Sequence, residues 1–368
     1  MEIKFNNLKV SYTKQKNILN NFKDLIKHQD YILGKKVYKL ENELSKFTKS
    51  NYCITTSSGT DALLIAILSL NLKKGSEVLT PAFSYISSTE VIIRAGCKPV
   101  FVDIDAKTMN ICVKDLEKKI NKNSSAIIVV SLFGQIPDVD KLKKIKKKFN
   151  IPIIEDGAQS FGAGFKNKKS CNIFDIGCTS FFPTKTLGCF GDGGAIFTNK
   201  KLIAKNCNFL RKHGQKKKYY YEFNGLNARL DTIQSIVLLE KLKSFKIELK
   251  KRNFLAAKYF FYLKKEKNIK FVKLMKNYYC VYPIFNILTT KRDSLAKFLE
   301  KKKIPTRIYY PYPLNKQKIF KKYNTNTTPN SEKISKEILS LPFHVNLKES
   351  EIKFIAHNIK KFFKTKKN

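Results

Sequence analysis

The sequence predicts an α/β protein with one large, mostly parallel sheet, followed by a smaller C-terminal α+β unit. Between residues 51 and 200, short apolar runs rich in β-branched residues alternate with segments of helical period. This alternation is typical of βα units whose parallel sheet is covered by helices on both faces. From about residue 230 the pattern changes to long helix and then to a second, shorter α/β succession.

The sheet strands are expected at the apolar runs, and helices at the amphipathic or apolar segments between them. The predicted strands are 52–57, 77–80, 99–104, 126–133, 151–156, 176–182 and 194–198. The predicted helices are 59–70, 86–96, 114–121 and 138–149. The last two strands are close enough in sequence to pair antiparallel with each other.

The C-terminal part is expected to begin with a long helix over 230–264. It is predicted to continue with strands at 278–287 and 304–309 and helices at 292–302, 331–339 and 350–363. The irregular segment 311–317, PYPLNKQ, is expected to be a site loop or a connection. We therefore divide the chain into a large domain, 1–245 with an N-terminal arm, and a small domain, 246–368 with the connecting helix.

The formal net charge of +43 is the most unusual compositional feature. Such a charge can indicate a polyanionic partner, such as nucleic acid, an acidic membrane face or a phosphorylated substrate. Only six of the 72 Lys and Arg residues are arginine, the residue that nucleic-acid readers use for bidentate contacts. The lysines are spread along predicted helices, as an AT-rich genome would produce on a solvated surface. We therefore expect no nucleic-acid partner.

Several simple patterns are absent from the sequence. No apolar run approaches the ~20 residues that cross a bilayer, and the first residues lack a secretory signal pattern. The eight cysteines show no CxxC spacing, and the four histidines are far apart. We expect a soluble, cytoplasmic protein with reduced thiols, no membrane insertion and no metal site.

Polar residues follow the predicted first strand at Ser58-Gly59-Thr60, where an apolar helix begins. The free N–H groups and the dipole of a helix N-terminus attract a phosphate, and glycine allows the anion to approach closely. The same residues could instead form an ordinary N-cap. The motif alone leaves both interpretations open.

The strand 151–156 ends on Asp156, with Gln159 three residues later. Such a carboxylate could cap a helix, bind a metal or pair with a cationic ring nitrogen. In a pyridoxal-phosphate (PLP) site it would keep the pyridine nitrogen protonated, which makes the ring an electron sink. Gln159 could then reach the phenolic oxygen of the cofactor.

Lys185 differs from the other lysines because it lies in an apolar, glycine-rich segment, TSFFPTKTLGCFGDGGA (179–195). Desolvation lowers the pKa of a lysine and frees the neutral amine for nucleophilic attack and a Schiff base. A lysine that reaches into solvent from a turn is the simpler alternative. The glycines at 188, 191, 193 and 194 count against it, because they imply a crowded backbone near a ligand. Ser180, five residues earlier, is a candidate phosphate donor.

Three more residues are candidates for ligand contacts. Tyr85 could stack on a flat ring, although an aromatic after a strand is often part of the core. Asn227 and Arg229 lie in a polar loop before the long helix. Arg229 could supply a bidentate fork for an anion or form a salt bridge at the helix start.

Taken together, these segments resemble the nucleotide-sugar aminotransferases of the DegT/DnrJ/EryC1/StrS family. The resemblance runs nearly the whole length and rests on motifs in order: SGTDAL, GSEVLTPAFSY, AGCKPVFVDID, IPIIEDGAQSFGA, TSFFPTKTLGCFGDGGAIFTN, RKHGQ, GLNARLDTIQ, YYPYPLNKQ and LSLPFH. It implies a PLP-dependent transferase of fold type I that works as a homodimer with shared active sites. A lysine rather than a histidine at position 185 implies transamination rather than dehydration.

The resemblance also implies a role for each candidate residue. Lys185 would hold the cofactor as a Schiff base, Asp156 would pair with its ring nitrogen and Gln159 with its ring hydroxyl. Tyr85 would take the stacking position. The phosphate would be bound by Gly59, Thr60 and Ser180, with Asn227 contributed by the other subunit.

The implied substrates are L-glutamate and a UDP-2-acetamido-3-oxo-hexuronate, an intermediate for surface polysaccharides such as O-antigen. Arg229 would then contact the sugar carboxylate. Where the family usually has a histidine, this chain has Tyr309, which can donate a hydrogen bond but carries no positive charge at neutral pH. Amination at C4 of a perosamine- or bacillosamine-type sugar is an alternative. A non-catalytic basic binding protein is a more distant one.

Overall fold

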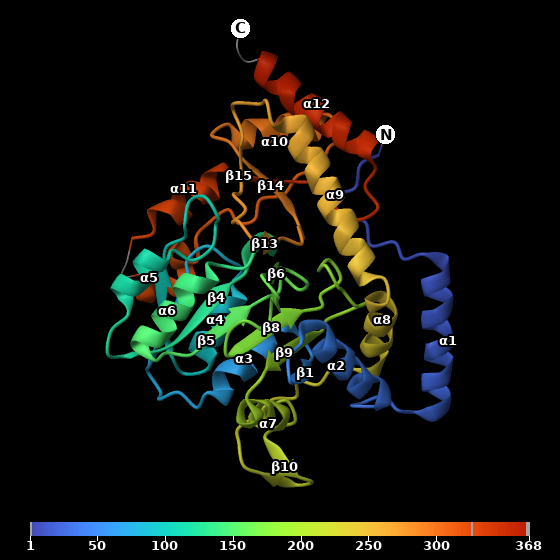
Figure 1. The fold of residues 1–368 in the computed structure, drawn as a ribbon, viewed down its shortest axis with the longest axis vertical. Helices are drawn as coiled ribbons and strands as arrows, with labels where there is room; N and C mark the ends of the chain where they lie inside the picture. The colour runs from blue at the N-terminus through green and yellow to red at the C-terminus, as the bar shows by residue number, and fades with distance from the viewer. Residues whose placement is uncertain (1, 325–326, 366–368) are drawn as a thin grey trace.

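A seven-stranded sheet runs through the middle of the molecule (Figure 1), in a computed structural model that describes residues 2–324 and 327–365. In spatial order its strands are β1 (Tyr52–Thr56), β9 (Gly194–Thr198), β8 (Ile176–Ser180), β5 (Ile153–Asp156), β4 (Ser124–Val130), β2 (Glu77–Pro81) and β3 (Lys98–Val102). Neighbours from β8 to β3 are parallel, whereas β9 is antiparallel to both β1 and β8. The large, mostly parallel sheet is therefore confirmed, as is the antiparallel pair β8–β9.

Helices cover both faces of this sheet. They are α2 (Lys35–Thr48), α3 (Gly59–Ser69), α4 (Ser87–Arg94), α5 (Val113–Lys119), α6 (Val139–Phe149), α7 (Lys201–Leu210) and α8 (Thr232–Leu242). Outside them, α1 (Tyr12–His28) packs against α8 (Figure 1). Successive strand residues point to opposite sides. Ile128 accordingly packs into the layer of α3, α4 and α7, and Ile127 into the layer of α5 and α6. Burial on both sides explains why these strands are continuous apolar runs rather than alternating ones.

The C-terminal part has its own apolar core around a small antiparallel sheet. The sheet consists of β12 (Lys270–Phe271), β14 (Phe285–Leu288) and β15 (Ile338–Leu341). Packed against it are α9 (Phe245–Leu263), α10 (Arg292–Lys301) and α12 (Glu349–Thr365). The N-terminal segment joins this core, because Ile3 is buried in it and the Phe343 N–H donates to the Phe5 carbonyl at 3.2 Å.

The remaining elements are short. A second small sheet joins β6 (Gly164–Phe165) and β7 (Lys168–Lys169) to β13 (Tyr278–Tyr279). The hairpin of β10 (Gln215–Lys217) and β11 (Tyr220–Tyr221) extends from the body at the bottom of Figure 1. α11 (Pro329–Glu337) precedes β15, and short 3-10 turns lie at η1 (Leu132–Gly134), η2 (Leu314–Lys316) and η3 (Lys318–Tyr323).

The long helix expected over 230–264 is in fact two helices. α8 ends at Leu242 and α9 begins at Phe245, because Ser244 leaves helical geometry at φ −104° and ψ 2°. This break turns the Phe245 side chain inward, where its ring packs against Phe47 and Phe161. Apolar periodicity continues across the break, so the pattern alone does not reveal it.

Three other C-terminal expectations were also wrong in detail. The strand expected at 278–287 is divided between β13 and β14, with Pro283, which has no N–H to donate, between them. The segment 304–309 forms only a single bridge, between Arg307 and Ser340, and is not a strand. The helix expected over 331–339 ends at Glu337, and β15 follows it at once.

Within residues 2–324 and 327–365, no helix has the length and apolar character needed to span a membrane. The same residues contain no group of three or more His, Cys, Asp or Glu side chains arranged to hold a metal ion. All eight cysteines are free thiols.

Candidate active site at the carboxyl edge of the sheet

The ends of three strands meet at one edge of the large sheet. Gly194, at the start of β9, lies opposite both Thr56 at the end of β1 and Ser180 at the end of β8. Asp156, at the end of β5, pairs with Cys178 two residues before the end of β8. This is the edge at which open α/β sheets bind ligands.

The loop between β1 and α3 lies directly against Ser180. A Cβ atom added at Gly59 would lie 2.6 Å from the Ser180 Cβ, so the close approach requires glycine. Ser58 is an N-cap, since its Oγ accepts from the Asp61 N–H at 3.0 Å. The N-cap interpretation therefore holds for Ser58. The next N–H groups of the helix, at Gly59 and Thr60, still point out of its first turn beside Ser180.

Asp156 and Lys185 lie close enough to influence each other electrostatically. Burial raises the pKa of Asp156, while the N–H of Ala158, which donates to Asp156 Oδ1 at 3.0 Å, and the charge of Lys185 lower it. Burial lowers the pKa of Lys185, and Asp156 acts in the opposite direction. Although Lys185 is only partly buried as a whole residue, its ammonium is desolvated, as a Schiff-base lysine requires.

The glycines around Lys185 are required for a different reason from the one expected. We predicted backbone crowding against a ligand, but the atoms that crowd them belong to the protein. A Cβ at Gly188 would lie 2.5 Å from the Pro183 carbonyl oxygen, and one at Gly191 would lie 2.9 Å from the Gln234 amide. The glycines thus allow the tight turn that carries Lys185, whose N–H donates to the Phe182 carbonyl at 2.8 Å.

Gln159 is buried and both ends of its amide are engaged. Its Oε1 accepts from the Phe133 N–H at 2.9 Å, and its Nε2 donates to the Tyr310 hydroxyl at 3.2 Å. Tyr310 was not predicted as a site residue, because the sequence singled out its neighbour Tyr309. The only available signal was that Tyr310 immediately precedes the irregular loop 311–317.

Tyr85 is 57% exposed, so the alternative that it belongs to the core was wrong. Its ring centroid lies 6.3 Å from that of Tyr310, which is also near Asp156. Tyr309 turns away toward the N-terminal segment, with its ring 6.3 Å from Phe5. The structure therefore groups Tyr85 with Tyr310 and Asp156, and it places Tyr309 at the margin of the group.

Asn227 and Arg229 form a separate pair before α8. Arg229 Nη2 donates to Asn227 Oδ1 at 2.5 Å, and Ala228 between them accepts from the Ser57 N–H at 3.1 Å. No ion pair within the described residues involves Arg229, so the expected alternative of a helix-start salt bridge is not seen. The pair lies near the β1–α3 loop, and within the described part of one chain no contact joins it to Lys185 or Asp156.

These residues provide complementary groups for PLP. The buried carboxylate of Asp156 suits a cationic ring nitrogen, the desolvated amine of Lys185 an aldehyde, and the Gly59–Ser180 cradle a phosphate. Exposed Tyr85 offers a ring face. A separate small cavity, lined by Phe133 and residues of the C-terminal part, does not include Lys185 or Asp156.

Comparison with known proteins gives the same family across the chain. Residues 12–360 match the model of the DegT/DnrJ/EryC1/StrS aminotransferase family. The UDP-2-acetamido-2-deoxy-3-oxo-D-glucuronate aminotransferase of Pseudomonas aeruginosa is 42% identical over 90% of this chain and 92% of its own. A pleiotropic regulatory protein of Geobacillus stearothermophilus is 36% identical over 94% of each chain.

Solved structures agree with these relatives. A DegT/DnrJ/EryC1/StrS aminotransferase from Brucella abortus superimposes with a TM-score of 0.93 at 33% identity, over 98% of this chain and 99% of the other. NtdA from Bacillus subtilis, solved with bound cofactor PMP, gives a TM-score of 0.89 at 29% identity, over 95% and 83%. The chain therefore belongs to the DegT/DnrJ/EryC1/StrS aminotransferase family, with the fold type I architecture and PLP dependence of those enzymes.

Proposed function

We propose that this enzyme transfers an amino group from L-glutamate to a keto-sugar nucleotide, most specifically a UDP-2-acetamido-3-oxo-hexuronate. The observation that carries the proposal is that a buried carboxylate, Asp156, and a desolvated lysine, Lys185, lie close enough at the carboxyl edge of the sheet for each charge to shift the pKa of the other. The 42% identity to the Pseudomonas aeruginosa enzyme supports the choice of sugar.

PLP, when bound, supplies an electron sink that acidifies the Cα–H of the amino donor. In this proposal Asp156 keeps the ring nitrogen protonated. Lys185 first anchors the cofactor and then, as a free amine, moves the proton at that carbon. Because burial lowers the pKa of Lys185, its amine can be neutral and act as a base closer to neutral pH.

The other site residues bind and orient the cofactor. Gly59, Thr60 and Ser180 would hold the phosphate at the N-terminus of α3, and Tyr85 would cover one ring face. Gln159 would donate to the ring hydroxyl through its Nε2. The crowding between Gly59 and Ser180 supports this arrangement, since it brings a helix N-terminus and a hydroxyl to one point.

The sugar-nucleotide side of the site would be completed by a second copy of the chain. Asn227 would reach the phosphate and Arg229 the sugar carboxylate of the partner's site, with Tyr309 donating to the sugar or diphosphate. Large apolar side chains after β8 and around the start of α8 are exposed and suit such a homodimer: Tyr31, Ile32, Phe182, Phe190 and Ile233.

The cofactor assignment is tested by the visible absorbance of the purified protein. Lys185→Ala should lose the Schiff-base band and all turnover, whereas Lys166→Ala, a substitution in an exposed loop, should keep both. A Lys185→Ala protein that retained the band and turnover would refute the proposal. A non-catalytic basic protein would show neither a band nor turnover in the wild type, and would bind DNA in a salt-dependent manner.

The substrate is tested by mass spectrometry of the products formed from a panel of sugar nucleotides with glutamate. The panel should include 3-oxo and 4-oxo sugars, each as UDP and dTDP derivatives. The proposal predicts turnover of the UDP-3-oxo-hexuronate. Exclusive turnover of a 4-oxo sugar would instead identify the perosamine- or bacillosamine-type reaction.

A further inference from the structure

We infer that Tyr310 and the backbone N–H of Phe133 are positioning groups that fix the Gln159 amide so that a hydrogen on Nε2, and not Oε1, faces the ring oxygen of the cofactor. The inference rests on the proposed function and adds two residues to the site. It also assigns a task to a tyrosine that belongs to the C-terminal part of the chain.

Phe133 determines which end of the amide is the oxygen. Its N–H lies 2.9 Å from Gln159 Oε1, and a backbone N–H can only donate, so the facing atom must be the acceptor. The N–H can point there because Phe133 adopts the left-handed region, at φ 55° and ψ 24°. This conformation is rare for a bulky residue.

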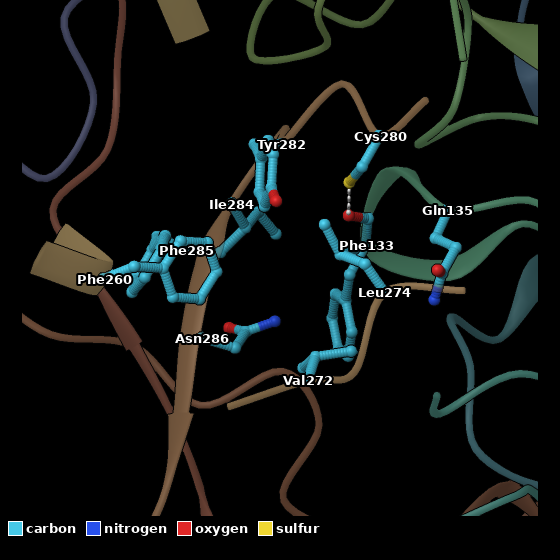
Figure 2. A pocket seen from close by; sticks show the side chains of 10 residues that line it. All are labelled: Phe133, Gln135, Phe260, Val272, Leu274, Cys280, Tyr282, Ile284, Phe285 and Asn286. Carbon is cyan, nitrogen blue, oxygen red and sulfur yellow. Dashed lines mark hydrogen bonds between the residues drawn. The ribbon is translucent and has the colours of Figure 1, made fainter. Parts of the chain in front are cut away.

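The surrounding structure holds this turn in place from the C-terminal side. The Cys280 thiol donates to the Phe133 carbonyl at 3.5 Å, as Figure 2 shows, and the Val281 N–H donates to the Gly134 carbonyl at 3.1 Å. Gly134 has φ +88°, and a Cβ there would lie 2.6 Å from Pro283 Cδ. The orientation of Gln159 is therefore built into the contact between the two parts of the chain.

Tyr310 occupies one of the two Nε2 hydrogens. Its hydroxyl accepts from Gln159 Nε2 at 3.2 Å, and its ring packs edge-on against Phe83 with centroids 6.1 Å apart. Burial, and then the charge of Asp156, raises the pKa of Tyr310, so the phenol stays neutral at working pH. The second Nε2 hydrogen is left for the site.

This arrangement predicts an electrostatic effect on the cofactor. A donor to the anionic ring oxygen weakens the hold of that oxygen on the proton it shares with the Lys185 nitrogen. The Schiff base of the loaded protein, which the visible band reports, should therefore lose its proton at a lower pH than it would without the donor. Loosening or reversing the Gln159 amide should move that transition to higher pH.

The test is a pH titration of the visible band of the PLP-loaded protein. Tyr310→Phe removes only the hydroxyl and should move the transition up by a few tenths of a pH unit. Gln159→Glu keeps an acceptor for Phe133 but turns an oxygen toward the ring oxygen, and should move it up by about one unit, the size of a lost charged hydrogen bond. Tyr282→Phe, a matched tyrosine beside the Phe133 cavity in Figure 2, should leave the transition unchanged.

The outcomes separate this inference from the function on which it depends. A loaded wild type and loaded Tyr310→Phe and Gln159→Glu proteins with the same transition would overturn the inference and leave the proposed function standing. If Tyr310→Phe did not fold, the shift of the pH transition in Gln159→Glu alone would decide whether the inference stands. A wild type with no band at any PLP concentration would refute the proposed function, and the inference with it.

Discussion

Asp103 ties the C-terminal part of the chain to the large sheet, and its removal should weaken that attachment measurably. The residue follows β3 and is 5% exposed. Its Oδ1 accepts from the N–H and the hydroxyl of Ser331, at 2.9 and 2.7 Å, and its Oδ2 accepts from the Asn330 N–H at 2.9 Å. A carboxylate distant in sequence thus caps the first turn of α11.

The expected loss follows from these contacts. Asp103→Ala leaves two helix N–H groups and a buried hydroxyl without an acceptor, which should lower the free energy of unfolding by about 2–4 kcal/mol. Asp105 provides a matched control, since the hydrogen bonds of its side chain reach only Lys107 and Thr108 within one turn. Asp105→Ala should cost only about 0.5–1 kcal/mol.

Urea unfolding followed by circular dichroism measures both variants, since the chain has no tryptophan. In Asp103→Ala the C-terminal part should unfold first, as a separate transition at lower urea. Equal losses for the two variants, or a loss below about 1 kcal/mol for Asp103→Ala, would refute the reasoning that α11 is held by this carboxylate.

Three further predictions concern the site. Asp156 raises the pKa of Lys185 against the effect of burial, so Asp156→Asn should lower that pKa further below the ordinary 10.5. Reductive trapping of PLP on Lys185, at saturating cofactor, should then reach its half-maximal rate at a lower pH. An unchanged pH profile of the trapping rate would contradict the coupling of Asp156 and Lys185. Gly59→Ala should raise the Kd for PLP, measured by equilibrium dialysis, about tenfold by overpacking against Ser180. Gly164→Ala is the control, because a Cβ there would lie 3.3 Å from its nearest atom, and it should leave this Kd unchanged. Arg229→Lys should raise KM about tenfold for a uronate substrate through loss of the bidentate fork, and an equal rise for a sugar without a carboxylate would exclude that role.

The central sheet was predictable because each of its buried strands carries the same short-range sequence pattern. Buried parallel strands need unbroken β-branched runs, and IPIIED and AIIVVSLF supply them. The C-terminal part was harder to predict, since short edge strands such as β15 have few residues with which to show a pattern. ILSL directly follows a helical segment, and its partner residues in β14 lie 50 to 56 positions earlier in the chain.

The site was predictable where a residue differs from its surroundings in type. Lys185 among apolar neighbours and Asp156 at the end of an apolar strand could both be identified from the sequence, and the structure brings them together. Tyr310 could not be predicted as a site residue, because nothing in the sequence of a Tyr-Tyr pair indicates which of the two rings turns inward. Its role depends on the backbone of Phe133 and the fold of the Gly134 turn, which are properties of three-dimensional packing.

The position of Ile3 and Phe5 has a consequence for the order in which the chain is made. These residues are translated long before Phe343, yet they pack against Phe343 and the core around it. About 340 residues must therefore be synthesised before the N-terminal segment meets its partner. At ≈ 5–20 residues per second, that segment waits for roughly 17 to 70 seconds. The large sheet can form during this interval, so a segment that is translated before the sheet reaches its final place after it.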